Sequence, residues 1–92
     1  MPKYQWETPG EIALNLAKRA KRIRKRKKIT QLQLASRSNV SYASLKRFEQ
    51  TGEISLVSLI KIAVELGIAD EIRSLFDSPV YSDISEVIND VK

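Results

Sequence analysis

The basic side chains are the first candidates for chemistry in this sequence. Nine of the eleven residues from Lys18 to Lys28 are lysine or arginine. Such a run is either a solvated helix face or a surface that contacts the phosphates of a polyanion. Because the run directly precedes the two-helix segment described below, we favour phosphate contact. The candidate phosphate-binding residues in it are Lys18, Arg22, Lys25 and Lys28.

A second candidate group lies on one side of a predicted helix over residues 41–50. Leu45 and Phe48 share the side that would be buried, and the opposite side carries Tyr42, Ala43, Lys46 and Arg47. These side chains suit the edges of base pairs. Arginine can bind guanine O6 and N7 together, alanine can touch a thymine methyl, and tyrosine offers a ring and a hydroxyl. Lys46 could contact a base or a phosphate, and for each residue alone the alternative is simple surface exposure.

Groups that support catalysis or metal binding are missing from the sequence. There is no cysteine and no histidine, which removes disulfides, thiolate ligands, the usual metal ligand and the usual general base near neutral pH. The acidic residues never form an acid/base or metal-binding constellation, and there is no glycine-rich phosphate loop. We therefore expect no enzymatic activity, no metal and no cofactor.

The segment from Gln31 to Gln50 must position the second group. Its apolar residues split near Asn39 into two helical faces instead of one stripe. Asparagine tolerates the left-handed backbone of a sharp turn, so Asn39 can end the first helix. Thr30 and Ser41 can each cap a helix start with a hydroxyl. Two short helices joined by a tight turn form a helix-turn-helix, whose second helix enters a DNA major groove.

The rest of the pattern predicts an all-α domain of five helices. Thr8, with Glu11 as its capping-box partner, should start a helix over 9–27 whose apolar stripe meets the core. That stripe consists of Ile12, Ala13, Leu16, Ala17, Ala20 and Ile23. A fourth helix should run from Ser55 to Gly67, and a short fifth helix with Ile68, Ile72, Leu75 and Phe76 should close the bundle. We divide the chain into an arm (1–8), a domain (9–77, with the helix-turn-helix at 31–50) and an amphipathic C-terminal tail (78–92).

Arg24 continues the apolar stripe of the first helix, where a charge would be costly without a partner. Glu49 is the only acidic residue between Glu11 and Glu53, and it follows Phe48 near the inner end of the third helix. We therefore predict a structural ion pair between Arg24 and Glu49.

Residues 16–66 resemble the lambda-repressor-like, or Xre, family of DNA-binding domains. The matching residues are Arg24, Ile29, Thr30, Gln31, Leu34, Ala35, Val40, Ser41, Leu45, Phe48, Glu49, Gly52, Ser55, Leu56, Leu59, Ile62, Ala63, Leu66 and Gly67. The sequence departs from the family at Asn39, where glycine is usual. The resemblance implies base reading by Ser41, Tyr42, Ala43, Lys46 and Arg47, a phosphate contact by Gln31, and a partly buried Arg24–Glu49 pair. It also implies a homodimer on a palindromic operator in double-stranded DNA.

The two parts of the chain carry opposite charge. Residues 1–50 hold 13 basic and 3 acidic residues, whereas residues 51–92 hold 3 basic and 8 acidic residues. A basic half favours a polyanion, and an acidic half that is also apolar favours a protein. Candidate dimer or partner contacts are Ile72, Leu75, Phe76, Ile84, Val87, Ile88 and Val91. The tail has three interpretations: a helix docked on its own domain, part of an interface, or a frayed end.

A sequence-specific transcriptional repressor is the function that these observations favour. The chain has the length of one domain, so we expect no separate sensor domain. In this it is similar to small Xre-type antitoxins that repress their own operon and bind a toxin encoded nearby, including those that accompany HipA-type kinases. The alternatives are a stand-alone or phage-type repressor and an interaction module that has lost DNA binding. With no apolar run near eighteen residues and no signal-peptide pattern, we expect no membrane association and a cytoplasmic location, at the nucleoid when bound to DNA.

Overall fold

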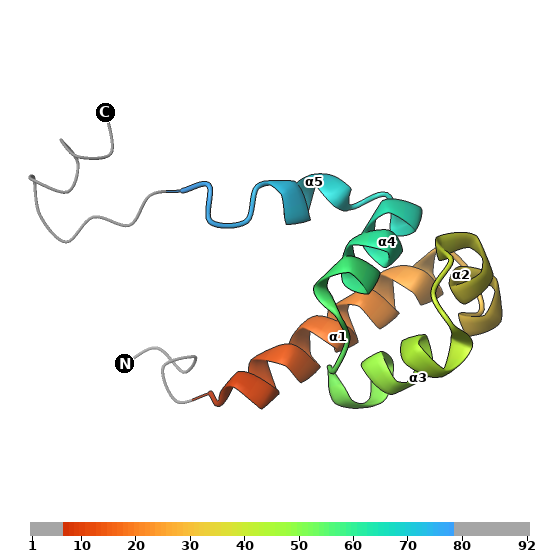
Figure 1. Cartoon of the computed structure of the whole chain (residues 1–92), viewed down its shortest axis with the longest axis horizontal. Coiled ribbons are helices and arrows are strands. Elements are labelled where there is room, and N and C mark those ends of the chain that lie inside the picture. The colour runs from red at the N-terminus through yellow and green to blue at the C-terminus, as the bar shows by residue number, and fades with distance from the viewer. Residues whose placement is uncertain (1–6, 79–92) are drawn as a thin grey trace, which may run out of the picture.

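The computed structural model describes residues 7–78, and within them every regular element is a helix, as the sequence predicts (Figure 1). The helices are α1 (Pro9–Arg26), α2 (Gln31–Ser38), α3 (Tyr42–Thr51), α4 (Leu56–Leu66) and α5 (Ala69–Arg73). Most of the arm predicted over residues 1–8, and the tail after Ser78, lie outside the described residues. The division into arm, domain and tail therefore stays a prediction.

Local hydrogen bonds explain where the helices begin. At the start of α1, the Thr8 amide donates to Glu11 Oε1 at 2.9 Å, and the Glu11 amide donates to Thr8 Oγ1 at 3.1 Å. Thr30 and Gln33 form the same capping box before α2. Hydrogen bonds from the Thr8 backbone and side chain lower the pKa of Glu11. The hydroxyls of Ser41 and Ser55 cap α3 and α4 in the same manner.

Three helices end in a left-handed residue followed by a backbone hydrogen bond that reaches five residues back. At these three ends the left-handed residues are Lys28, Asn39 and Gly67, and the amides of Ile29, Val40 and Ile68 make the bonds. After Asn39, the Val40 amide donates to the Ala35 carbonyl at 3.0 Å, which closes the corner between α2 and α3. The sequence predicts the ends at Asn39 and Gly67. It does not predict left-handed backbone at Lys28, because lysine has no intrinsic preference for that conformation.

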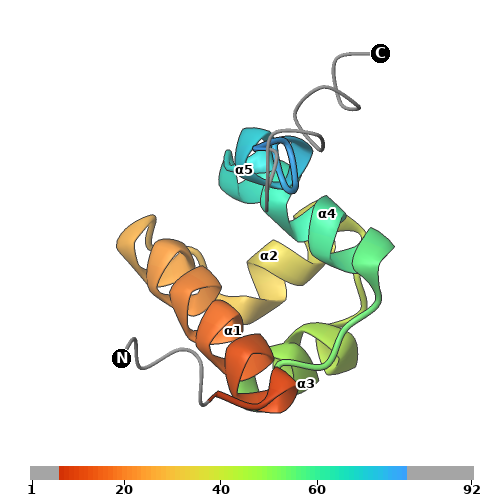
Figure 2. The same cartoon turned by 90° about the vertical axis from the view of Figure 1, so that its left-hand side faces the viewer.

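The core lies where α1 packs on α3 and α2 packs on both α3 and α4 (Figure 2). Its buried members are Ala17, Leu34, Ala35, Val40, Leu45, Phe48, Ile62 and Leu66. Each comes from the apolar side of a helix or from the turn between α2 and α3, as expected for amphipathic helices around one core. The core thus holds α3 by one side and leaves its other side uncovered.

The apolar stripe predicted for α1 is only partly buried. Ala17 is fully buried and Ile23 packs against the core, but Ile12 is 45% exposed and Leu16 is 48% exposed. The covered side of α1 is the one that carries Ala17 and Arg24, which faces α3. Around the helix, Leu16 lies about 90° and Ile12 about 130° away from this side, so α3 does not cover them.

The prediction that a fifth helix closes the bundle is wrong for its last residues. α5 ends at Arg73, and beyond it Leu75 is 52% exposed and Phe76 is 96% exposed. Ile68 does pack against the core, and Ile72 is half-buried. Residues 74–78, which follow α5, run away from the other helices (Figure 1). Leu75 and Phe76 are therefore not covered by any of the described helices.

At Gly52 the backbone at the end of α3 packs closely against the backbone of α1. Gly52 has left-handed backbone with φ of 84°, and a Cβ built on it would lie 2.6 Å from the Ala13 carbonyl carbon and 2.7 Å from the Leu14 amide nitrogen. Those atoms belong to helical backbone, which cannot move aside without breaking the hydrogen bonds of α1. Only glycine fits this close approach.

We expect Gly52→Ala to destabilise the fold by roughly 2–3 kcal/mol, since left-handed backbone and overpacking are each unfavourable for alanine. Urea unfolding followed by circular dichroism would measure the change. Gly10→Ala is the matched control, because a Cβ there would have only Thr8 Oγ1 near it, at 3.9 Å. Equal stability of the two variants would show that the backbone at Gly52 and at Ala13 does not approach as described.

Candidate nucleic-acid interface

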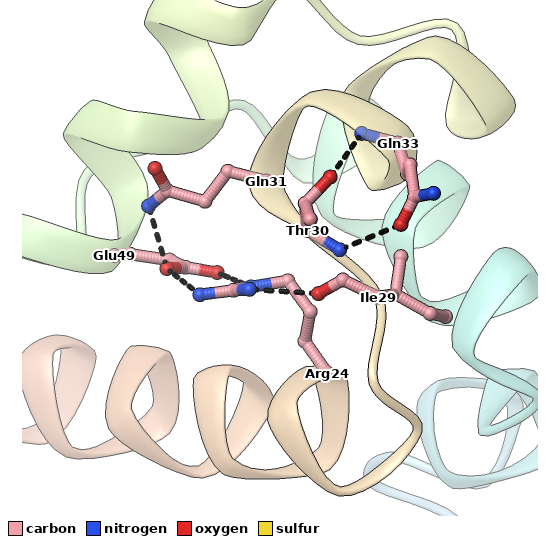
Figure 3. Close-up of polar contacts among 6 residues, drawn as sticks. All are labelled: Arg24, Ile29, Thr30, Gln31, Gln33 and Glu49. Carbon is pink, nitrogen blue, oxygen red and sulfur yellow. Dashed lines mark hydrogen bonds and ion pairs between the residues drawn. The ribbon is translucent and has the colours of Figure 1, made fainter.

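A buried polar cluster joins α1, α2 and α3 beneath the candidate interface (Figure 3). Arg24 donates from Nε to Glu49 Oε2 at 2.7 Å and from Nη2 to Glu49 Oε1 at 3.0 Å. Its Nη1 donates to the Ile29 carbonyl in the turn between α1 and α2, at 2.8 Å. Arg24 and Glu49 are each 7% exposed. The two residues expected to pair are therefore together, and the bidentate pair fixes α3 against α1.

Gln31 belongs to the same cluster. Its Nε2 donates to Glu49 Oε1 at 2.8 Å, so this carboxylate oxygen accepts from both Gln31 and Arg24. No buried side-chain polar atom in the described part of the chain lacks a partner. The phosphate contact suggested for Gln31 stays a prediction, and the second N–H of its amide is the donor that would serve it.

The outer side of α3 is polar and open to solvent. Leu45 and Phe48 are 1% and 2% exposed, which places Tyr42, Ala43, Lys46 and Arg47 on the uncovered side. Lys46 Nζ lies 5.9 Å from the centroid of the Tyr42 ring, close enough for a cation–π contact that holds the two side chains together. The geometry thus presents an aromatic ring and two cations from one exposed helix.

Two of the predicted base readers already have partners within the chain. The Ser41 hydroxyl accepts from the Ser44 amide at 3.1 Å and donates to Ser44 Oγ at 2.8 Å, so it serves mainly as the cap of α3. Arg47 is paired with Glu53, which follows the end of α3. Base reading by any of the five residues stays a prediction.

The basic residues predicted to bind phosphate lie along α1 and at its end. Lys18, Arg22 and Lys25 are exposed on α1, and Lys28 is exposed in the left-handed turn that follows. The structure adds a further candidate, Lys21, which lies between the buried Ala17 and Arg24 on the side of α1 toward α3. The same spacing around the helix could have shown this in the sequence.

Gln50 is a second exposed polar residue of α3 that the sequence pattern did not single out. It is exposed and lies four residues after Lys46, so it continues the outer side of α3 toward the helix end. Its amide can donate and accept together, which suits an adenine edge.

A helix-turn-helix family model matches residues 21–71, which is 51 of the 92 residues. The match begins within α1, ends within α5, and contains the whole of α2, α3 and α4 together with Arg24 and Glu49. Searches of curated proteins and of solved structures find no match. Among the described residues, none of the helices is long and apolar enough to cross a membrane, and no group of acidic residues could hold a metal ion.

Proposed function

The chain belongs to the lambda-repressor-like helix-turn-helix family of DNA-binding transcription regulators, and from this premise we propose that it is a sequence-specific repressor. The observation that carries the proposal is the outer side of α3, whose exposed Tyr42, Lys46 and Arg47 stand on a helix fixed from behind by the buried Arg24–Glu49 pair. A rigid helix with polar side chains on one open side is what reading a major groove requires.

The outer side of α3 and the basic residues of α1 have different proposed roles in DNA binding. We propose that α3 enters the major groove, where Arg47 binds a guanine edge and Ala43 touches a thymine methyl. The exposed lysines and arginines of α1 contact phosphates and set the register of the protein on the duplex. Base contacts then supply the sequence preference, and phosphate contacts supply much of the affinity.

A second copy of the chain completes the proposed complex. One α3 reads only a few base pairs, and helix-turn-helix domains bind two half-sites about one helical turn apart. The exposed Leu75 and Phe76, with the half-buried Ile72, support an apolar contact after α4. The other proposed contacts, Ile84, Val87, Ile88 and Val91, lie outside the described residues.

We expect the full chain to form a dimer in sedimentation equilibrium. Phe76→Ser should raise the dissociation constant of this dimer, because it removes an exposed apolar side chain from the proposed contact.

Base readers and phosphate contacts should respond differently to mutation. Arg47→Ala should cost about 1–3 kcal/mol on operator DNA and relax the preference at one base position, because it removes one bidentate contact. Lys25→Ala should weaken binding to operator and random duplexes alike. Fluorescence anisotropy on both duplexes separates the two patterns. Equal losses on both duplexes for both variants would contradict the assignment of Arg47 as a reader.

DNase footprinting of the full chain on the DNA upstream of its own gene tests the proposed function directly. We expect protection of a palindromic site at concentrations that leave random DNA unbound. Absence of any protected site, with no retardation of random DNA, would favour an interaction module that has lost DNA binding.

We further propose that the protein is an antitoxin that represses its own operon. The resemblance to small Xre-type antitoxins and the acidic, apolar second half of the sequence support this role. Co-purification of the tagged chain with the product of a neighbouring gene would be the expected result. A tagged chain that binds its operator but retains no neighbouring product would favour a stand-alone or phage-type regulator.

A further inference from the structure

Glu53 holds the guanidinium of Arg47 at the edge of the candidate interface. Arg47 Nε donates to Glu53 Oε1 at 3.0 Å, and Nη2 of the same arginine donates to the same oxygen. Both side chains remain accessible, at 67% exposed for Arg47 and 63% for Glu53. The guanidinium is thus oriented before any ligand arrives, although it stays in solvent.

The backbone of Glu53 is tied to the helix turn that carries Arg47. The Thr51 hydroxyl donates to the Arg47 carbonyl at 2.7 Å and accepts from the Glu53 amide at 3.1 Å. Between them, the Gly52 amide donates to the Phe48 carbonyl at 2.7 Å, and Gly52 lies against the backbone of α1. The carboxylate therefore starts from a fixed position and does not sit on a loose loop.

The geometry of the pair decides which edge of Arg47 can bind a ligand. Glu53 takes the edge formed by Nε and Nη2. The edge formed by Nη1 and Nη2 is not taken by Glu53, and its two parallel N–H groups can bind guanine O6 and N7 together. An arginine held in this way loses less conformational entropy when it reads a base than a mobile one would.

The charge of the pair acts against the competing contact. A phosphate attracts Arg47 by its positive charge, but Glu53 neutralises that charge locally and its own carboxylate repels a phosphate. Binding of guanine depends on donor geometry more than on net charge, so Glu53 weakens the guanine contact of Arg47 less than it weakens the phosphate contact. A protein gains specificity when it disfavours a competing contact, here to phosphate, as well as favouring the specific contact, here to guanine.

We propose that Glu53 is a positioning residue that directs Arg47 to a base edge and away from the phosphate backbone. It acts through Arg47 and raises the ratio of operator binding to random-DNA binding. The inference rests on the proposed function, because it concerns how that same helix discriminates between sequences. As an exposed ion pair, Arg47–Glu53 contributes little to folding, so its effect should show in DNA binding and not in stability.

Glu53→Gln in the full chain tests the proposal, because glutamine keeps the shape and removes the charge. The probes are a duplex carrying the footprinted upstream site and a duplex of random sequence. We expect tighter binding to random DNA, with a salt dependence steeper by about one phosphate contact per protomer. The ratio of operator to random affinity should fall by roughly 5- to 100-fold, the discrimination of one bidentate base contact. The thermal midpoint should not change.

Two controls separate the proposal from its rivals. In an Arg47→Ala background, Glu53→Gln should leave the affinity ratio unchanged, because the effect passes through Arg47. Asp70→Asn removes a carboxylate from another exposed ion pair, Asp70–Arg73 on α5, and should also leave the ratio unchanged. An unchanged ratio in the single Glu53→Gln variant, or an equal fall in both backgrounds, would overturn the inference while the proposed function stands. A wild-type chain that binds both duplexes equally would refute the proposed function and this inference with it.

Discussion

Replacing Glu49 with alanine should lower the free energy of unfolding by about 3–5 kcal/mol, as expected when one partner of a buried ion pair is removed. Arg24 is 7% exposed and donates to Glu49 from two nitrogen atoms. Without the carboxylate, the guanidinium keeps only the Ile29 carbonyl as a partner, and the Gln31 amide loses its acceptor as well. Urea unfolding of the full chain would measure the loss.

The double variant Arg24→Ala, Glu49→Ala sharpens this test. Once Glu49 is absent, removing the unpaired arginine should restore part of the stability, so the two losses should not add. Asp70→Ala is the matched control, because its pair with Arg73 is almost fully exposed and should contribute less than about 1 kcal/mol. A Glu49→Ala loss as small as that of the control would show that the cluster does not hold α1 and α3 together.

Operator affinity should fall by about 10³- to 10⁵-fold between about 50 and 200 mM salt if a dimer neutralises about 6–10 phosphates. The physical reason is the release of counterions condensed on the DNA when lysine and arginine replace them. The exposed basic residues of α1, together with Lys28 in the turn after it, supply enough cations in two copies. Anisotropy titrations over a range of potassium chloride concentrations would give the slope of log affinity against log salt concentration.

Single lysine variants show where the salt dependence arises. Lys25→Ala and Lys28→Ala should each lower the slope by about one per protomer on both operator and random DNA. Lys61→Ala, which removes an exposed charge from α4, should leave the slope unchanged. If the slope is unchanged in the Lys25 and Lys28 variants, α1 does not contact phosphates, whatever the role of α3.

The starts of α1, α2, α3 and α4 and the central corner at Asn39 could be predicted from sequence because local contacts determine them. Thr8, Thr30, Ser41 and Ser55 each bond to a backbone amide three residues ahead, so residue type and spacing suffice. Asn39 similarly marks a left-handed turn by its own conformational tolerance. The Arg24–Glu49 partnership was also accessible, because a charge within an apolar stripe had only one nearby candidate of opposite sign.

Other features depend on packing that the sequence does not encode locally. Lys28 is left-handed because the chain must turn from α1 into α2, not because lysine favours that backbone. Ile12 and Leu16 fit an apolar stripe, but their exposure follows from which side of α1 α3 covers. Glu53 is six residues from Arg47, and their contact exists only because Gly52 turns the chain back at the end of α3.

α3 is attached to α1 at two separate places, and this affects how the DNA sequence preference of the protein can change. Glu49 meets Arg24 in one place, and Gly52 rests on the Ala13 backbone in another. If α3 enters a groove as proposed, the angle of its approach is therefore set by α1, a helix that need not touch a base. Substitutions at inward positions of α1 would then change the DNA sequence that the protein prefers, although every side chain proposed to contact a base stays the same.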